Sequence, residues 1–194
     1  MADARHPRRV CAVAEEEPLP TIFDRIDADD AAGVRVLLAS DPAAAEARDE
    51  AGLSPLVRAA YRGRGDVFDA VRAASTLTDP WDRVVAGEQD GLPAPDAWSP
   101  DGFTALHLAA FAHNAGAVRA LLAAGADQNA ISRASFAQVT PLGTAVFAGS
   151  VEIARILVER GADPTIAGPG GGTPLDTAQA NGDAELVALL SLPG

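Results

Sequence analysis

Apolar residues recur along the chain at the spacing of short amphipathic helices. Val118, Leu121 and Leu122 stand at positions i, i+3 and i+4, which places them on one face of a helix. The same spacing appears three more times, and each occurrence predicts a short helix that buries one apolar face. The other sets are Val34 with Leu37 and Leu38, Ile153 with Ile156 and Leu157, and Leu186 with Leu189 and Leu190.

A second recurring string marks where other helices begin. It opens with Ser or Thr, continues with Pro in three copies of four, and always has Leu in the third place. A Ser or Thr hydroxyl can accept a hydrogen bond from a free N–H of the first helical turn. Pro suits the first helical position because it has no N–H to leave unpaired. The strings occupy residues 54–60, 104–110, 140–146 and 173–179.

Three of the four strings, at 104–110, 140–146 and 173–179, are followed by one of these apolar helix faces, so the two patterns together define a repeating unit. Two units end in Gly-Ala-Asp, at residues 125–127 and 161–163, where Gly is the expected left-handed cap. The stretch 22–42 fits the same template without the capping hydroxyl, with Pro20 in the place of the Thr. The units therefore start near residues 20, 54, 104, 140 and 173.

A period near 33 residues, with two short helices and a Gly-terminated turn, resembles the ankyrin repeat. The string at 104–110 is close to the family's signature, with Ala105 in place of Pro. The resemblance implies an all-α solenoid of stacked helix-turn-helix units with short β-hairpin fingers. We expect a single repeat domain over residues 19–194, preceded by a disordered tail over residues 1–18. Helices this short are marginal alone, so stacking must stabilise them.

The interval between the units at 54 and 104 is too long for one repeat. Residues 78–81 (Thr-Asp-Pro-Trp) have the features of a capped helix start, and Trp81, Val84 and Val85 then share one face. We predict a half repeat within residues 77–101, followed by a loop; a plain loop insertion is the alternative. Extra residues near 132–137 are expected to lengthen one finger.

Composition and charge narrow the class of partner. The formal net charge is −12 and the sequence pI is about 4.5, which disfavours nucleic acid and anionic membrane surfaces. The single cysteine, Cys11, cannot form an internal disulfide, and no apolar run is long enough for a membrane span, so we expect a cytoplasmic protein. All fifteen basic residues are Arg, which is typical of a GC-rich, bacterial genome.

The candidate chemistry is sparse, and we predict no catalytic residue, no cofactor and no metal site. The resemblance implies that His107 braces a turn by hydrogen bonding to backbone. The cluster Asp27, Asp29 and Asp30 lacks the Gly and Glu of a calcium loop, so it is expected to be an exposed turn that caps a helix. The Gly-rich stretch 168–173 lacks the Lys of a P-loop and is expected to be a finger tip.

Aligning the repeats brings aromatic and aliphatic residues into two columns. In the family these columns line a concave groove or its fingers, so the resemblance implies that they bind a partner protein; ordinary packing between repeats is the alternative. The expected partner-binding residues are Tyr61, Arg62, Trp98, Phe103, Phe111, Ala112, Val139, Phe147 and Ala148.

The sequence therefore predicts a non-catalytic protein-interaction module, expected to be monomeric. Two other functions remain open at this point. The first is a homo-oligomeric structural or stabilising subunit, because the C-terminal helix is unusually apolar for a terminal cap. The second is a small-molecule-binding protein, which would need convergent polar groups in a closed pocket.

Overall fold

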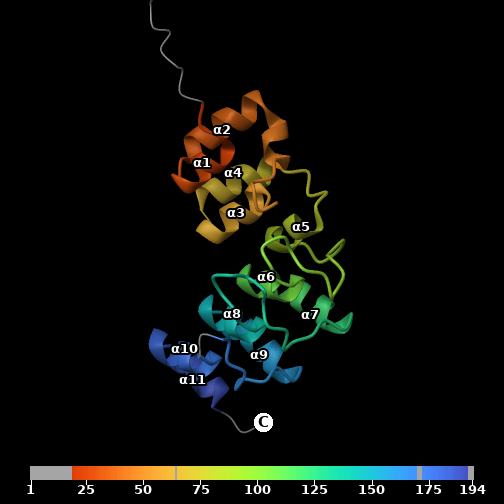
Figure 1. Ribbon diagram of the computed structural model, residues 1–194, viewed down its shortest axis with the longest axis vertical. Coiled ribbons are helices and arrows are strands. Elements are labelled where there is room, and N and C mark those ends of the chain that lie inside the picture. The colour runs from red at the N-terminus through yellow and green to blue at the C-terminus, as the bar shows by residue number, and fades with distance from the viewer. Residues whose placement is uncertain (1–18, 64, 170–171, 192–194) are drawn as a thin grey trace, which may run out of the picture.

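The structure is a computed structural model that describes residues 19–63, 65–169 and 172–191. Over these residues the chain is an elongated stack of short helices (Figure 1) with no named β-strand, which confirms the expected all-α class. The expected tail 1–18 and part of the Gly-rich stretch lie outside the described residues. The helices are α1 (Ile22–Asp27), α2 (Ala31–Ser40), the 3-10 helix η1 (Pro42–Glu46), α3 (Pro55–Arg62), α4 (Asp66–Ala74), α5 (Pro80–Ala86), α6 (Ala105–Phe111), α7 (Ala115–Ala123), α8 (Pro141–Phe147), α9 (Val151–Glu159), α10 (Pro174–Asn181) and α11 (Ala184–Leu190).

The helices form antiparallel pairs that stack in chain order. The first helices of the pairs pack on one another, α1 on α3 and then α6 on α8 on α10. The second helices form a parallel layer, with α2 against α4 and α7 against α9 and then α11. The lone helix α5 packs between α3 and α6 and is followed by a loop (Figure 1). Two rows of helices result, with the connecting loops along one edge.

The helix starts owe their position to side-chain caps. The Ser54 and Thr140 hydroxyls accept hydrogen bonds from Val57 N and Gly143 N, both at 3.1 Å. The first unit corrects one expectation, because Thr21 supplies the capping hydroxyl that this unit was thought to lack. Thr21 N donates to Asp24 Oδ2 at 2.8 Å, and Asp24 N donates back to Thr21 Oγ1 at 3.2 Å. This reciprocal capping box makes Thr21, the residue after Pro20, the cap of α1, which begins at Ile22.

The finger loops differ from the expected β-hairpins. Three of them have a backbone hydrogen bond that closes the loop near its base: Asp49 N to Leu53 O at 3.0 Å, Ser99 N to Phe103 O at 2.7 Å and Ser132 N to Val139 O at 2.9 Å. Within the described ranges, one isolated antiparallel bridge, between Trp98 and Thr104, is the only β-type pairing. The fingers are therefore tight turns rather than strand ladders.

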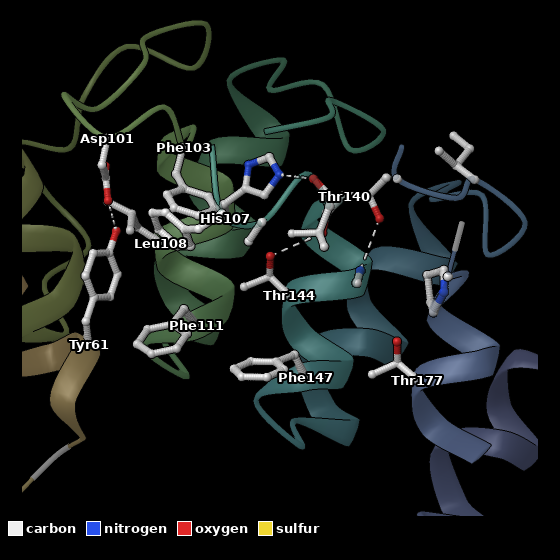
Figure 2. A pocket seen from close by; sticks show the side chains of 18 of the residues that line it. Tyr61, Asp101, Phe103, His107, Leu108, Phe111, Thr140, Thr144, Phe147 and Thr177 are labelled. Carbon is white, nitrogen blue, oxygen red and sulfur yellow. Dashed lines mark hydrogen bonds between the residues drawn. The ribbon is translucent and has the colours of Figure 1, made fainter. Parts of the chain in front are cut away.

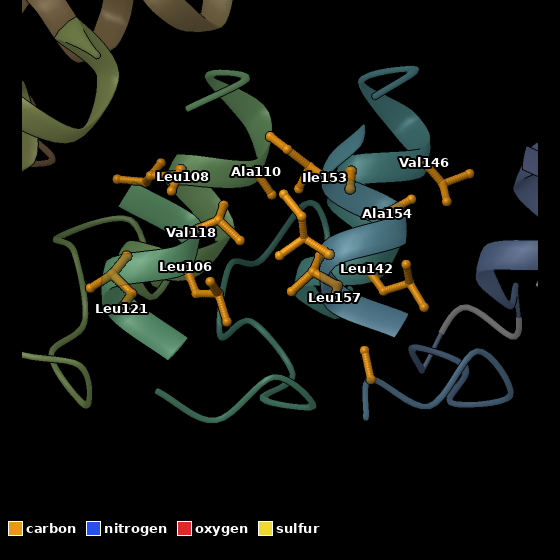
Figure 3. Close-up of a cluster of buried hydrophobic side chains, with 14 of the residues drawn as sticks. Leu106, Leu108, Ala110, Val118, Leu121, Leu142, Val146, Ile153, Ala154 and Leu157 are labelled. Carbon is orange, nitrogen blue, oxygen red and sulfur yellow. The ribbon is translucent and has the colours of Figure 1, made fainter. Parts of the chain in front are cut away.

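The apolar faces gather into two buried clusters that meet at α5. The C-terminal cluster extends from α5 to α11 and includes Leu106, Leu142 and Leu157, all fully buried (Figure 3). The N-terminal cluster extends from α1 to α5. Val84 belongs to the C-terminal cluster and its neighbour Val85 to the N-terminal one, and both are fully buried. Helix α5 thus contributes apolar side chains to both cores.

Candidate partner-binding groove

A groove of about 730 Å³ lies along the first helices and their finger loops (Figure 2). Its walls come from α3, α6, α8 and α10 on one side and from four fingers on the other. None of the α5 residues lines it. The groove therefore crosses the junction between the two core clusters without using the helix that joins them. Apolar residues contribute most of the lining, including Leu53, Phe103, Leu108, Phe111, Phe136, Val139, Phe147 and Ile166.

Aromatic rings form the N-terminal part of the groove. The Tyr61 ring meets Phe111 edge-on, with 5.5 Å between centroids, and meets Phe103 at 6.4 Å. Phe136 extends the cluster, with its ring 5.7 Å from that of Phe103. Tyr61 comes from α3 and Phe111 from α6, so these contacts bridge the two halves of the stack on the groove side. Edge-to-face pairs of this kind stabilise packing by about 1 kcal/mol beyond simple burial.

A carboxylate stands beside this aromatic cluster. The Tyr61 hydroxyl donates to Asp101 Oδ2 at 2.6 Å, and the Ser99 hydroxyl approaches Asp101 Oδ1 at 2.5 Å. Burial, followed by the charge of Asp101 and this hydrogen bond, raises the pKa of Tyr61 far above its ordinary value. Tyr61 therefore acts as a neutral donor that holds Asp101 in place.

The turn that carries Asp101 is fixed by its backbone. Gly102 has φ +90°, a left-handed conformation, and a Cβ there would lie 2.8 Å from Ala134 N in the next finger. Gly102 O accepts a hydrogen bond from Arg133 N at 2.7 Å, which ties the two fingers together. Ser99 Oγ also accepts from Phe103 N at 3.0 Å. Asp101 thus sits on a turn with little freedom.

His107 has the bracing role that the resemblance implied. It lies on the groove wall but only 1% of its surface is exposed. Its Nδ1 accepts from Thr104 N at 3.3 Å, and its Nε2 lies 2.9 Å from the carbonyl oxygen of Val139 in the next finger. Because a carbonyl can only accept, Nε2 carries the proton. Burial lowers the pKa of His107 to about 4, so the neutral ring is held in place.

Both arginines at the N-terminal end of the groove are paired with acids. Arg58 contacts Asp27 at 2.6 Å and Asp49 at 3.4 Å, and Arg62 contacts Asp27 at 3.0 Å. Hydrogen bonding to Arg58 lowers the pKa of Asp27. This end of the groove therefore offers no unpaired guanidinium group.

Six of the nine expected partner-binding residues line the groove. These are Tyr61, Arg62, Phe103, Phe111, Val139 and Phe147.

They differ in how far they are available to a partner. Phe147 is 71% exposed, whereas Phe103 is buried within the aromatic cluster. Of these two aromatic residues, Phe147 is therefore the one whose ring a partner can cover. The role of all six residues in binding stays a prediction.

Three expected residues lie elsewhere. Ala112 is buried in the N-terminal core cluster, with 2% of its surface exposed, so its side chain is not accessible in the free chain. Trp98 lies outside the groove lining, where the guanidinium of Arg133 covers its ring at 3.9 Å from the centroid. Ala148 is half-buried at the end of α8 and is also outside the lining.

Several groove-lining residues were not among the expected contacts, and Phe136 is the most exposed apolar one. Phe136 is 72% exposed and faces the groove from the finger that contains the extra residues near 132–137. The lengthened finger was the available signal, because an apolar side chain in a polar insertion has no core to enter. The contact between Asp101 and Tyr61 could not be predicted from the sequence, since the two residues are 40 positions apart.

Other kinds of site find no support in the described ranges. No group of three or more His, Cys, Asp or Glu side chains could hold a metal ion among the residues that the structure describes. In the same part of the chain, no helix combines the length and the apolar character needed to cross a membrane.

Comparison with known proteins identifies the repeat. Residues 88–167 match the family model for ankyrin repeats (three copies). This match covers the part of the chain from the loop after α5 to the loop after α9, and the all-α stack is similar in architecture to an ankyrin-repeat solenoid; ankyrin repeats generally mediate protein–protein binding.

One curated relative is similar over part of its length. The chain is 44% identical over 84 residues to Protein PhlB of Serratia liquefaciens, an alignment that covers 43% of this chain. The chain aligns with 36% of that relative, little more than a third of its length.

Proposed function

We propose that this chain is a non-catalytic recognition module that binds a partner protein through the groove and the tips of its finger loops. The observation that carries the proposal is the pair of exposed aromatic rings, Phe136 from a finger loop and Phe147 from α8, which line the same groove. Large aromatic side chains that are exposed in a concave surface are typical anchors of protein interfaces. The cost of leaving them in water is recovered when a partner covers them.

The groove is suited to binding because it is already formed. Its walls are helices with buried apolar faces, and its fingers are held by backbone hydrogen bonds such as Arg133 N to Gly102 O. A preformed surface loses little conformational entropy on association, so more of the contact energy appears as affinity. We also propose that the domain spans residues 19–194 with α5 as a half repeat, and that the protein is cytoplasmic and binds neither nucleic acid nor membranes.

The alternative of a homo-oligomer through the C-terminal helix receives less support. Leu186, Leu189 and Leu190 are at most 8% exposed and pack into the C-terminal cluster. These three apolar residues of the C-terminal helix therefore pack into the core of their own chain and are not available to a second copy. We propose a monomer, which light scattering over a range of concentrations would test: a mass that rises with concentration would favour the oligomer.

Capture of a partner from the lysate of the source organism tests the function. Three baits are compared: the wild type, a groove variant with Phe136→Ser and Phe147→Ser, and a matched control with Val36→Ser. Val36 suits the control because it is 70% exposed on α2 and lies outside the groove lining. We expect a stoichiometric protein with the wild type and the control and its loss with the groove variant. Equal capture by all three proteins would refute the groove, and the absence of any captured protein would shift support to a small ligand.

A further inference from the structure

We propose that the groove receives a short, extended, apolar segment of the partner protein, and that an Arg or Lys side chain of this segment pairs with Asp101. This inference rests on the proposed function and specifies the chemistry of the partner. Four features carry it: the unpaired charge of Asp101, the paired state of the nearby arginines, the apolar wall beyond them, and the length of the groove.

Asp101 is a carboxylate whose position is fixed by two hydroxyl groups. Its two oxygens are approached by the hydroxyls of Tyr61 and Ser99, which orient the group without neutralising it. Among the described residues Asp101 makes no ion pair. It lines the groove directly, next to aromatic rings. A guanidinium or ammonium group of a ligand would find here an oriented, negatively charged acceptor, which favours a cation.

The rest of the charge around the groove disfavours an acidic ligand. Arg58 and Arg62 line the same end, but Asp27 and Asp49 already hold their guanidinium groups. An acidic or phosphorylated segment would have to break these pairs. The formal net charge of −12 also attracts basic segments and repels a second copy of this chain.

Beyond Asp101 the groove is apolar. Phe111 and Phe147 project from α6 and α8, and Phe136 projects from the finger opposite (Figure 2 labels the first two). Polar groups deeper in the groove are already engaged, as in Thr144, whose hydroxyl donates to Thr140 O at 3.2 Å. Apolar side chains therefore suit this part of the groove better than polar ones, which would lose water without gaining partners.

The dimensions favour an extended segment of modest length. The groove crosses α6, α8 and α10, and packed helices lie about 8–10 Å apart, so this part spans roughly 20 Å. An extended chain covers about 3.3 Å per residue, which corresponds to about six residues. The basic residue is placed at the end of the segment nearest α3.

Selection from a phage-displayed library of random peptides, with the full chain as bait, tests this inference. We expect enriched peptides to combine a run of apolar residues with an Arg or Lys at one end. The best peptide and its Arg/Lys→Gln version are then synthesised and titrated by fluorescence anisotropy. With Asp101→Asn, affinity for the basic peptide should fall about tenfold, as expected for a lost charge-assisted contact. The Gln peptide should bind wild type and Asp101→Asn equally.

Tyr61→Phe separates pairing from positioning, because it keeps the carboxylate and removes the hydroxyl that orients it. We expect this variant to bind the basic peptide within about threefold of wild type, since one neutral donor contributes less than the charge itself. Equal weakening by Tyr61→Phe and Asp101→Asn would overturn the ion pair.

Enrichment of acidic or uncharged peptides, or of none, would also overturn it. The proposed function is judged separately, by loss of lysate capture with Phe136→Ser and Phe147→Ser.

Discussion

Two contacts between successive first helices, α6 with α8 and α3 with α5, can be compared; each is called a step of the stack here. In one step the third helical residue is a histidine, and in the other it is an aspartate. His107 and Asp82 each occupy the third residue of a first turn, after the caps Thr104 and Asp79. His107 reaches forward, and its Nε2 donates to Val139 O in the next finger. Asp82 reaches backward, and its Oδ1 accepts from the hydroxyl of Ser54, the cap of the preceding unit.

The two steps differ in how well these buried groups are satisfied. Both ring nitrogens of His107 have partners, whereas Asp82 Oδ2 is buried without a hydrogen bond from any described residue. Burial raises the pKa of Asp82 to about 6. An unsatisfied buried oxygen costs about 1–3 kcal/mol. The comparison indicates that regular repeats are tied forward by a matched contact, while the α3–α5 step is the weaker joint of the stack.

The largest expected effect on the free energy of unfolding comes from truncating a buried leucine in the core cluster on each side of the α3–α5 step. Leu56 and Leu142 hold the same place in their helix-start strings and both are fully buried, one in each cluster. We expect Leu56→Ala and Leu142→Ala each to cost about 2–5 kcal/mol. Because the joint is weak, each change should lower the stability of its own cluster first, and urea unfolding followed by circular dichroism should then show two transitions.

Tryptophan fluorescence provides the control for this experiment. Trp81 packs against both clusters, so its signal should follow whichever cluster unfolds first. A single transition in both variants, coincident by both probes, would mean that the two halves unfold as one unit and that the joint is not weak.

The second effect concerns His107 and pH. Its folded pKa of about 4 lies below the ordinary value of 6.5, so the stability that depends on the neutral ring is present above pH 6.5 and lost as pH falls toward 4. One pKa unit corresponds to about 1.4 kcal/mol, so this loss amounts to at most about 3 kcal/mol. The advantage of wild type over His107→Gln should therefore shrink between pH 7 and pH 4 in urea titrations. A constant advantage would contradict the buried, neutral ring.

Asp82 should give the opposite slope over nearly the same range. Its folded pKa of about 6 lies above the ordinary value of 3.8, so its contribution is fully present below pH 3.8 and lost as pH rises through 6. The difference in unfolding free energy between wild type and Asp82→Asn should fall by at most about 3 kcal/mol from pH 4 to pH 7.

In wild type the opposite effects of His107 and Asp82 on the pH dependence of the unfolding free energy partly cancel. Each variant removes one of the two effects, so the pH dependence that remains reports on the other residue. Parallel slopes for His107→Gln and Asp82→Asn would refute the contrast between the two steps.

Much of this architecture followed from the sequence because repeats make the same local signals several times. The caps at Ser54, Thr140 and Thr173 and the apolar faces after them predicted most of the helix pairs. Thr21 was not predicted as a cap because it is followed by Ile22 and Phe23 and so lacks the Leu that marks the other helix starts.

Contacts between distant residues could not be predicted in this way. The Asp82–Ser54 and Tyr61–Asp101 pairs join residues 28 and 40 positions apart, and they depend on how α5 seats between its neighbours. The burial of Ala112 in the N-terminal core cluster, directly after α6, could not be predicted from the local pattern either.

The smallest expected effect on stability comes from comparing two groove-side aromatic residues, one in each step of the stack. Tyr61 and Phe147 occupy the same column of the repeat, but Tyr61 packs against both core clusters while Phe147 is 71% exposed. Phe147→Ser should change the free energy of unfolding by less than about 0.5 kcal/mol, as is usual for exposed positions. Tyr61→Ser should cost several times more, because it removes contacts that bridge the joint.

Urea unfolding of both variants at one pH makes this comparison directly. If Phe147→Ser were as destabilising as Tyr61→Ser, the Phe147 ring would be part of the core in solution. Its exposure could then no longer support the groove as a binding surface. A stable Phe147→Ser protein that loses its partner would instead separate binding from folding, since the residue would contribute to the complex and almost nothing to the free chain.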